Sequence, residues 1–332
     1  MINMRKVAEE ANVSVATVSR VLNGSNNVSI KTKLKVLKVI EEYNYEPNML
    51  GQNLRKSKTK IILVLVPNIS NPFYSQIVHG INRTCFKNGY YIMICETELN
   101  ENRVSQYLSL IKKKLADGMI TLDPHIDKEK LRDLADKYPV VQCCEYDMDS
   151  QIPYVTIDNT LAAYKAVNYL ITLGHRKIAI INSDERFIYS RLRKEGYLKA
   201  LKEHNIEINE KWIINSELDF ISGQSAVKHL MVMEDRPTAI FAVSDILAIG
   251  AIKGIKELNL NVPSDVSVIG FDNIEFSNMI TPALTTISQP MYNIGKEAAK
   301  MIINKLENKN VEIYNTILES ELIIRESTNL NS

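Results

Sequence analysis

The residues whose types and spacing point most directly to chemistry lie near the N-terminus, in the run N-V-S-V-A-T-V-S-R-V-L-N at 12–23. Ser14 predicts the N-cap of a helix that begins at Val15, because its hydroxyl can accept a hydrogen bond from a free N–H group of the first turn. Helical spacing places three apolar side chains on one face of this helix, namely Val18, Val21 and Leu22. The cap and the other side hold the candidate contact residues, which are Ser14, Val15, Ala16, Thr17, Ser19, Arg20 and Asn23.

A guanidinium group beside small methyl groups on one helix face suits the major groove of DNA. Arg20 carries forked donors that match guanine O6 and N7, while Val15 and Ala16 offer methyl contact, for instance to thymine. A short helix predicted over Arg5–Ala11 precedes this segment and leaves room only for a tight turn. Two short helices joined so closely predict a helix-turn-helix.

A third helix, predicted over Ile30–Tyr45, completes a three-helix unit, with Leu34, Leu37 and Ile40 expected to face its core. Its other sides carry lysines that suit either phosphates or water, at Lys31, Lys33, Lys35 and Lys38. Residues 1–60 hold 11 Lys and Arg against 5 Asp and Glu, whereas the remaining 272 residues hold 29 against 34. A basic head on an acidic body indicates a polyanion-binding module joined to a second domain, and an uneven solvated surface is the alternative.

The segment after Pro47 predicts a linker with a short helix. Residues 48–56 (N-M-L-G-Q-N-L-R-K) allow about two helical turns, which are marginal alone. Gly51 weakens such a helix by up to about 1 kcal/mol relative to alanine. Leu50 and Leu54 would share one face at i and i+4, although a plain linker is also compatible with this composition.

From Ile61 onward, short apolar runs alternate with amphipathic stretches. The runs predict strands covered on both sides at 61–66, 91–95, 118–122, 140–144, 178–181, 239–243 and 266–271. The stretches predict helices at 73–88, 103–115, 161–173, 192–204, 223–233 and 245–258. This alternation predicts a doubly wound α/β body, and similar series on either side of about residue 160 favour two lobes. Ligands in such sheets bind beyond the carboxyl ends of the strands.

Several classes of function find no support in the sequence. The motifs G-x-S-x-G, G-x-G-x-x-G and G-x-x-x-x-G-K-[ST] are absent, so we expect no enzyme. Cysteines at 85, 95, 143 and 144 and five scattered histidines have no zinc-like spacing, so we propose no metal site and no cofactor. Without a signal-peptide core or an apolar run that could span a bilayer, we expect a cytoplasmic protein without a membrane partner.

Nearly the whole chain resembles the lactose/galactose-repressor family. The resemblance rests on ordered motifs: V-A-x-x-A-x-V-S-x-A-T-V-S-R-V-L-N at 7–23, Y-x-P-N at 45–48, N-P-F-Y at 71–74, D-G at 117–118, G-H-R-K-I-A at 174–179, R-P-T-A-I at 236–240, S-D-x-x-A-x-G at 244–250 and V-P-x-D-V-S-V-I-G-F-D-N at 262–273. Two further stretches, 155–170 and 284–298, are most similar to the cytidine-repressor subgroup.

The resemblance implies a DNA-binding transcriptional regulator, expected to be a repressor, which binds an inverted-repeat operator as a homodimer. Its implied parts are a helix-turn-helix domain at 1–46, a hinge helix and linker at 47–60, and a two-lobed body at 61–332 resembling periplasmic binding proteins. Lobe one is expected at about 61–158 plus 290–317, and lobe two at about 159–289 plus 318–332. Leu54 matches the family leucine that wedges between central base pairs, whereas Gly51 replaces the usual alanine.

The family's effector contacts transfer to Phe73 and Tyr74 in lobe one and to Arg193, Phe220, Ser244 and Asp272 in lobe two, and two further pocket positions fall at Cys144 and Tyr189, with Glu145 beside them. Structural alternatives are a core position for either phenylalanine, an ion pair for Arg193 and a helix cap for Asp272. We assign Asp245 to capping the following helix.

Aromatic platforms at Phe73/Tyr74 and Phe220, with Arg193 and Asp272 for hydroxyl groups, predict a neutral effector. A polyanion is disfavoured by the carboxylates. The cytidine-repressor resemblance favours a nucleoside, and a monosaccharide is the alternative. A sugar receptor without a DNA role would need a secretory signal in place of the basic head. After the strand-like run Leu318–Ile324 only eight residues remain, which are too few for a coiled coil and so predict a dimer, not a tetramer.

Overall fold

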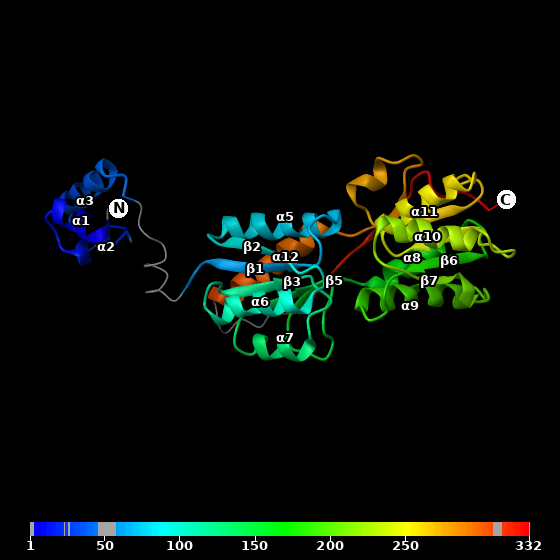
Figure 1. Cartoon of the computed structure of the whole chain (residues 1–332), viewed down its shortest axis with the longest axis horizontal. Helices are drawn as coiled ribbons and strands as arrows, with labels where there is room; N and C mark the ends of the chain where they lie inside the picture. The colour runs from blue at the N-terminus through cyan, green and yellow to red at the C-terminus, as the bar shows by residue number, and fades with distance from the viewer. Residues whose placement is uncertain (1–2, 23, 26, 46–57, 308–313, 332) are drawn as a thin grey trace. The chain divides into compact units, whose positions relative to one another are not determined.

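The computed structural model describes residues 3–22, 24–25, 27–45, 58–307 and 314–331 (Figure 1). Contacts divide the chain into two compact units, Met1–Thr59 and Lys60–Ser332, which we call the head and the body. Most of the predicted hinge segment, including Gly51 and Leu54, lies outside the described residues, as does Asn23.

The head contains three helices, α1 (Met4–Glu10), α2 (Val15–Leu22) and α3 (Ile30–Glu42). Asn3 and Ser29 cap α1 and α3 by accepting hydrogen bonds from the backbone N–H groups of Lys6 and Thr32. The helices enclose a small core of eight buried residues, which are Val7, Ala8, Ala11, Val18, Val21, Val36, Val39 and Tyr45.

The predicted core face of α3 is wrong in part. Leu34 and Leu37 are 63% and 41% exposed, whereas Val36 and Val39 are buried and only Ile40 of the predicted stripe packs against the core. Two apolar stripes coexist on α3, and helical spacing alone cannot decide which one faces α1 and α2.

Lobe one of the body is built on a parallel six-stranded sheet in the order β11-β5-β4-β3-β1-β2. Its strands are β1 (Ile61–Val66), β2 (Tyr91–Glu96), β3 (Gly118–Thr121), β4 (Val140–Cys143), β5 (Tyr154–Ile157) and β11 (Thr316–Leu318). Its helices are α5 (Pro72–Lys87), α6 (Glu101–Lys112), α7 (Lys128–Ala135) and α12 (Met291–Glu307). Leu63 and Leu65 of β1 belong to the α6/α7 core, and Ile62, Val64 and Val66 to the core that contains α5 and α12.

Lobe two repeats this plan in a second six-stranded sheet, ordered β12-β10-β9-β8-β6-β7, in which only β12 runs antiparallel to its neighbour. Its strands are β6 (Ile178–Asn182), β7 (Ile213–Asn215), β8 (Ala239–Ala242), β9 (Ser267–Asp272), β10 (Thr285–Ser288) and β12 (Glu321–Ile323). Its helices are α8 (Asn159–Thr172), α9 (Ile188–Glu203), α10 (Phe220–Met231) and α11 (Asp245–Glu257), with short 3-10 turns at Glu210–Trp212 and Glu275–Asn278. The predicted two-lobed, doubly wound α/β body is therefore present.

The chain passes between the lobes three times, between β5 and α8, between β10 and α12, and between β11 and β12 (Figure 1). The single strand predicted over Leu318–Ile324 is thus two short strands, one in each lobe. The first crossing is near residue 158 and the second near 289, close to the boundaries that the sequence predicts. None of the helices in the described parts of the chain combines the length and the hydropathy needed to cross a membrane.

Candidate nucleic-acid interface and effector pocket

The predicted reading helix is α2, and Ser14 precedes it as expected. The Oγ atom of Ser14 accepts a hydrogen bond from the backbone N–H of Thr17 at 3.1 Å and lies 2.9 Å from the Thr17 hydroxyl. Val15, Ala16 and Arg20 are exposed. The methyl groups and the guanidinium group of the candidate interface therefore remain accessible on a helix whose other face is buried in the head.

Ser19 differs from the prediction that it faces outward, since it is only 8% exposed. It lies beside Leu22 on the helix, at the edge of the apolar face, where a small side chain is readily covered by its neighbours. Contact between Ser19 and DNA is therefore less direct than the sequence suggested. The four lysines of α3, in contrast, are all exposed, at Lys31, Lys33, Lys35 and Lys38.

The predicted effector contacts of the body converge on a cleft between the lobes, at the carboxyl ends of the strands. The outer part of this cleft has a volume of about 490 Å³, and its lining includes Tyr74, Phe187, Tyr189 and Leu218. The inner part is only about 30 Å³ and is lined by Asn71, Phe73, Tyr74, Leu122, Cys144, Glu145, Asn159, Tyr189, Arg193, Leu218, Ser244, Asp272 and Gln289. Eight of the nine predicted effector residues thus line one inner pocket.

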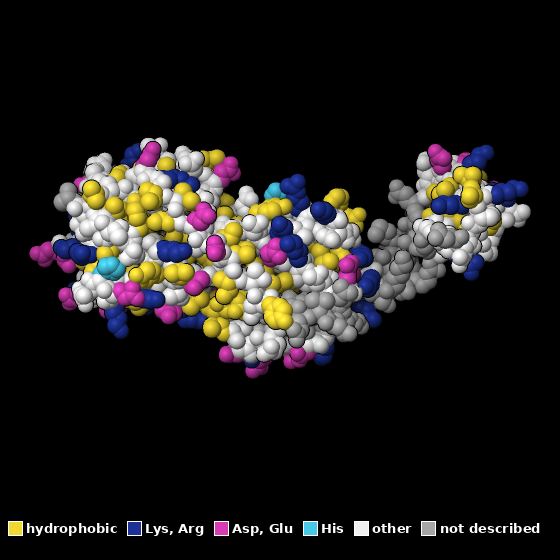
Figure 2. Space-filling view, turned by 180° about the vertical axis from the view of Figure 1, so that it is seen from behind, with side chains coloured by type: hydrophobic (Ala, Val, Ile, Leu, Met, Phe, Trp, Pro, Cys, Tyr) yellow, Lys and Arg dark blue, Asp and Glu magenta, His cyan; other side chains and the backbone are white. Residues whose placement is uncertain are grey.

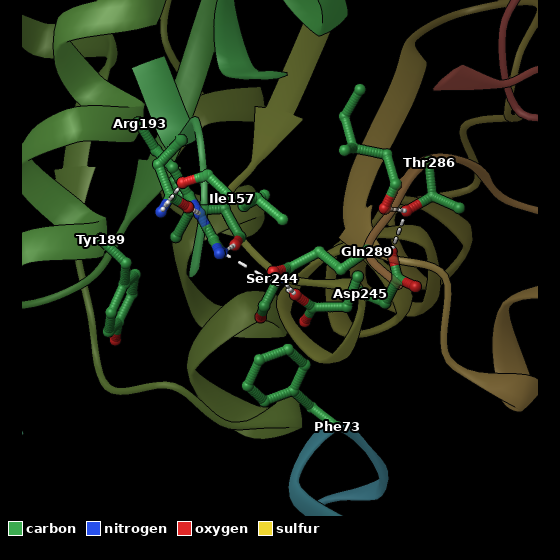
Figure 3. A network of polar contacts seen from close by, with 12 residues as sticks. Phe73, Ile157, Tyr189, Arg193, Ser244, Asp245, Thr286 and Gln289 are labelled. Atoms are coloured by element: carbon green, nitrogen blue, oxygen red, sulfur yellow. Dashed lines mark hydrogen bonds and ion pairs between the residues drawn. The ribbon is translucent and has the colours of Figure 1, made fainter. Parts of the chain in front are cut away.

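Arg193 on α9 is the central cation of this pocket and is only 5% exposed. Its Nε donates to Asn159 Oδ1 at 2.9 Å, and Nη1 donates to the carbonyl oxygen of Val243 at 2.5 Å (Figure 3). The guanidinium group also lies 3.7 Å from the centre of the Phe271 ring. Among the described residues, two of its five N–H groups have hydrogen-bond partners, so three donors remain for a ligand.

Asp272, the last residue of β9, supplies the opposing charge. Its Oδ1 lies 3.8 Å from Nη1 of Arg193 and accepts a hydrogen bond from Nε2 of Gln289 at 2.7 Å. Burial raises the pKa of Asp272, and Arg193 opposes that rise. Its backbone has a φ of 123°, a strained conformation of the kind found at functional sites. Asp272 is therefore a pocket residue, and its carboxylate also accepts a hydrogen bond from the backbone N–H of Asp245 at the start of α11.

Glu145, which follows β4 in lobe one, holds the start of α9 in lobe two. Its two carboxylate oxygens accept hydrogen bonds from the backbone N–H groups of Ile188 at 3.0 Å and Tyr189 at 2.9 Å. The N-cap residue of α9, Phe187, provides no such side-chain bond. Burial raises the pKa of Glu145 to about 7, against the opposing effect of these two N–H groups. One carboxylate thus caps a helix across the lobe boundary.

The pocket has aromatic surfaces from both lobes. Phe73 and Tyr74 lie at the start of α5, where Asn71 caps the helix by accepting a hydrogen bond from the Phe73 N–H. Figure 3 shows Phe73 approaching from lobe one toward the side chains of lobe two. Tyr189 provides the facing ring, and its hydroxyl donates to Ser183 Oγ at 3.1 Å. Cys144, with a φ of 65°, lies on the floor as a free thiol whose pKa is raised by burial.

Two assignments from the sequence need correction. Phe220, predicted as the aromatic platform of lobe two, is 37% exposed and lines neither part of the cleft, because it begins α10 and Leu218 occupies the wall instead. Asp245 does not cap α11, since Ser244 accepts the hydrogen bond from the Leu247 N–H.

Asp245 has a different structural role. Its carboxylate accepts hydrogen bonds from the backbone N–H of Ile274 and from the hydroxyls of Ser277 and Thr286. The contact with Thr286 can be followed in Figure 3. It is completely buried, and it joins the start of α11 to the segment after β9 and to β10. Asp245 therefore supports the backbone on which Asp272 stands.

Sequence reasoning missed two residues that position the charged pair. Asn159 and Gln289 lie where the chain crosses between the lobes, and they hydrogen-bond Arg193 and Asp272. Both are within stretches noted for subgroup resemblance, 155–170 and 284–298. The described residues contain no cluster of three His, Cys, Asp or Glu side chains arranged to hold a metal ion.

The elevated pKa of Glu145 predicts a pH-dependent stability. Because the folded-state pKa of about 7 lies above the ordinary value of 4.5, the folded protein holds this proton more tightly than the unfolded chain. The group therefore favours folding most below pH 4.5 and weakens it as the pH rises toward 7. We expect Glu145→Gln to remove about 1–2 kcal/mol of the wild-type decline between pH 5 and 7, measured by urea unfolding. An identical decline in wild type and variant would contradict the assignment, and Glu203→Gln serves as a control.

The comparisons with known proteins agree with this architecture. Residues 3–48 match the model of bacterial regulatory proteins of the lacI family, and residues 59–326 match that of periplasmic binding proteins and the sugar-binding domain of the LacI family. The HTH-type transcriptional repressor CytR of Escherichia coli K12 is 36% identical over 98% of this chain and 96% of its own length. The ribose operon repressor of Haemophilus influenzae is 33% identical over 98% of each chain.

Among solved structures, the lac repressor dimer bound to operator and the anti-inducer ONPF has a TM-score of 0.89 and 26% identity, and the match covers 99% of both chains. One family model matches the head and the other matches the body, and the matches to the two repressors span nearly the whole of both chains. The chain therefore belongs to the lacI family of bacterial transcriptional regulators, with a helix-turn-helix head followed by a two-lobed effector-binding type of body.

Proposed function

We propose that this protein is a homodimeric repressor whose affinity for an inverted-repeat operator is controlled by a small neutral effector, with a nucleoside as the favoured ligand. The observation that carries the proposal is the buried Arg193, which keeps unused donors in a cleft beside Asp272 and two aromatic surfaces. Such a site holds a polar ring by stacking and by charge-assisted hydrogen bonds to its hydroxyl groups.

The electrostatics of the cleft favour a neutral effector over a phosphorylated one. The outer cavity is lined by four carboxylate residues and by no lysine or arginine, the four being Glu96, Glu98, Glu217 and Asp219. A phosphate dianion there would be repelled by these groups. A nucleoside and a monosaccharide both satisfy this condition. The similarity to CytR supports the first, and the similarity to a ribose operon repressor keeps the second open.

The operator contact is proposed for α2. Arg20 would read a guanine in each half-site, with Ser14, Val15, Ala16 and Thr17 beside it and the lysines of α3 near phosphates. Asn23 and Leu54 belong to the same proposal and lie outside the described residues. In the similar lac repressor structure a dimer is bound to operator, which supports a two-headed arrangement for this chain.

Homodimer formation has support from exposed apolar side chains on the body. In lobe one these are Phe86, Tyr91, Met93 and Ile94, at 69%, 56%, 39% and 41% exposure. In lobe two they include Ile221, Phe276 and Met279, at 64%, 50% and 62% exposure. Hydrophobic side chains are visible over the face of the body in Figure 2. Apolar groups in such numbers are typical of a covered surface.

Arg20→Ala is expected to weaken operator binding by about 1–3 kcal/mol per half-site, because a forked pair of hydrogen bonds to guanine is lost. Arg20→Lys keeps the charge without the fork and should recover only the salt-dependent part of the affinity. Operator fragments selected from random DNA by the wild-type protein provide the substrate for a fluorescence-anisotropy titration. Wild-type affinity in Arg20→Ala would show that Arg20 does not read the operator.

The effector is expected to depend on Asp272. Calorimetric titration with cytidine should show binding in the wild type. The analogue 2′,3′-dideoxycytidine should bind more weakly by about 1–3 kcal/mol, because the loss of its two ribose hydroxyls leaves buried polar groups of the protein unpaired. Asp272→Ala should abolish the difference between the two ligands, whereas the distant Asp235→Ala should preserve it. Tight binding of ribose or a hexose with no response to cytidine would exclude the nucleoside. Unchanged affinity in Asp272→Ala would exclude the site.

The dimer is expected to depend on the exposed edge strand of lobe one. Tyr91→Glu would place a charge in the proposed interface and should shift the molecular mass, measured by light scattering, from dimer toward monomer. Met148→Glu introduces the same charge at a residue that is 71% exposed after β4 and should leave the dimer intact. A wild-type monomer, or a tetramer, would refute the proposed dimer.

A further inference from the structure

Lobe one has a second cavity, which shares no lining residue with the effector cleft. It lies between α6 and α7 and has a volume of about 530 Å³. Its lining consists of Ser105, Leu108, Lys112, Lys130, Asp133, Leu134, Lys137 and Tyr138. A volume in this range accommodates a metabolite-sized molecule.

The cavity has an excess of positive charge. Lys112, Lys130 and Lys137 surround it against a single carboxylate, Asp133. None of these three lysines takes part in the ion pairs recorded for the described residues. Three ammonium groups around one concave surface repel one another, and a bound anion would relieve that repulsion.

The remaining lining suits the organic part of an anionic ligand. Leu108 and Leu134 are 5% and 2% exposed and form an apolar floor, while Ser105 and Tyr138 bring hydroxyl groups that can donate hydrogen bonds. Inorganic phosphate would occupy only a small part of this volume. Three lysines, an apolar floor and two hydroxyl groups together suit a phosphate that is attached to a sugar or a nucleoside.

Two other cavities in the described residues do not share this charge. A cavity of about 660 Å³ in lobe two balances Arg176, Lys177 and His204 with three acidic residues, Glu207, Glu210 and Asp235. The outer effector cleft is acidic. We propose that the cavity between α6 and α7 binds a phosphorylated metabolite, with Lys112, Lys130 and Lys137 holding its phosphate.

The helix α7 connects this cavity to the effector cleft through ion pairs and hydrogen bonds. Arg132 and Lys128 of α7 form ion pairs with Asp147 at 2.5 and 3.4 Å, and the Asp147 side chain is only 2% exposed. Asp147 is two residues from Glu145, which caps α9 across the lobe boundary. A ligand that shifts α7 therefore acts on the segment of lobe one whose Glu145 caps α9 of lobe two.

The test is calorimetry on the full-length protein with inorganic phosphate, pyrophosphate and ribose 5-phosphate as probes. We expect ribose 5-phosphate to bind more tightly than phosphate alone. The triple variant Lys112→Gln/Lys130→Gln/Lys137→Gln should bind ribose 5-phosphate at least about tenfold more weakly, because three charge-assisted contacts are lost. A second triple variant, Lys202→Gln/Lys211→Gln/Lys256→Gln, removes the same charge from lobe two and should bind like the wild type.

Several outcomes would overturn the site. Absence of binding by all three probes would do so, as would equal weakening in both triple variants, which would indicate a general effect of net charge. Loss of affinity for non-operator duplex DNA in the first triple variant, with unchanged ribose 5-phosphate binding, would assign these lysines to a DNA-facing surface instead. The unfolding temperature of each unliganded variant should match that of the wild type, so that altered binding reports on the cavity.

Discussion

The body depends on a guanidinium group that is buried at the junction of its two lobes. Burying a charge without compensation costs several kcal/mol, about the entire stability of many domains. Arg193 receives its compensation from Asn159 at the first crossing, from the carbonyl oxygen of Val243 after β8, and from Asp272 at the end of β9. These groups meet because the carboxyl ends of parallel strands from both sheets face the junction between the lobes. The pocket therefore depends on the doubly wound topology.

Hydrogen bonds at the same junction also link lobe one to lobe two. Glu145 satisfies the free N–H groups of α9, so a change in the separation of the lobes breaks hydrogen bonds at a helix end. Arg193 lies one turn further along α9 and fixes the other side of the pocket. The positive φ angles of Cys144 and Asp272 mark two places where strained backbone is held in position by this network. An effector bound in this pocket would therefore contact the same hydrogen-bond network that links the two lobes.

The sequence predicted the fold from local patterns, whereas most of the pocket residues were transferred from the family that the chain resembles. Strands buried on both faces read as continuous apolar runs, and short motifs at the strand ends carry the family's resemblance. The failures concern choices made by tertiary packing. Two apolar stripes on α3 were equally spaced, and only contact with α1 and α2 selects the valines. Phe220 begins a helix that turns it away from the cleft, while Asn159 and Gln289 act through partners distant in sequence.

The two cavities that involve lobe one differ in the charge of their lining residues, and this difference would select different ligands. The proposed effector cleft combines an acidic outer cavity with an inner cation whose charge is partly balanced by Asp272. Neutral molecules with hydroxyl groups would gain hydrogen bonds there, and phosphate esters would be repelled at the entrance. The α6/α7 cavity has the opposite charge and an apolar floor. A metabolite and its phosphorylated form would on this basis occupy different sites on one protein. Because α7 also holds Asp147 beside Glu145, the two forms would act on the same lobe junction, one from the cleft at the carboxyl ends of the strands and the other from the α6/α7 face of the lobe-one sheet.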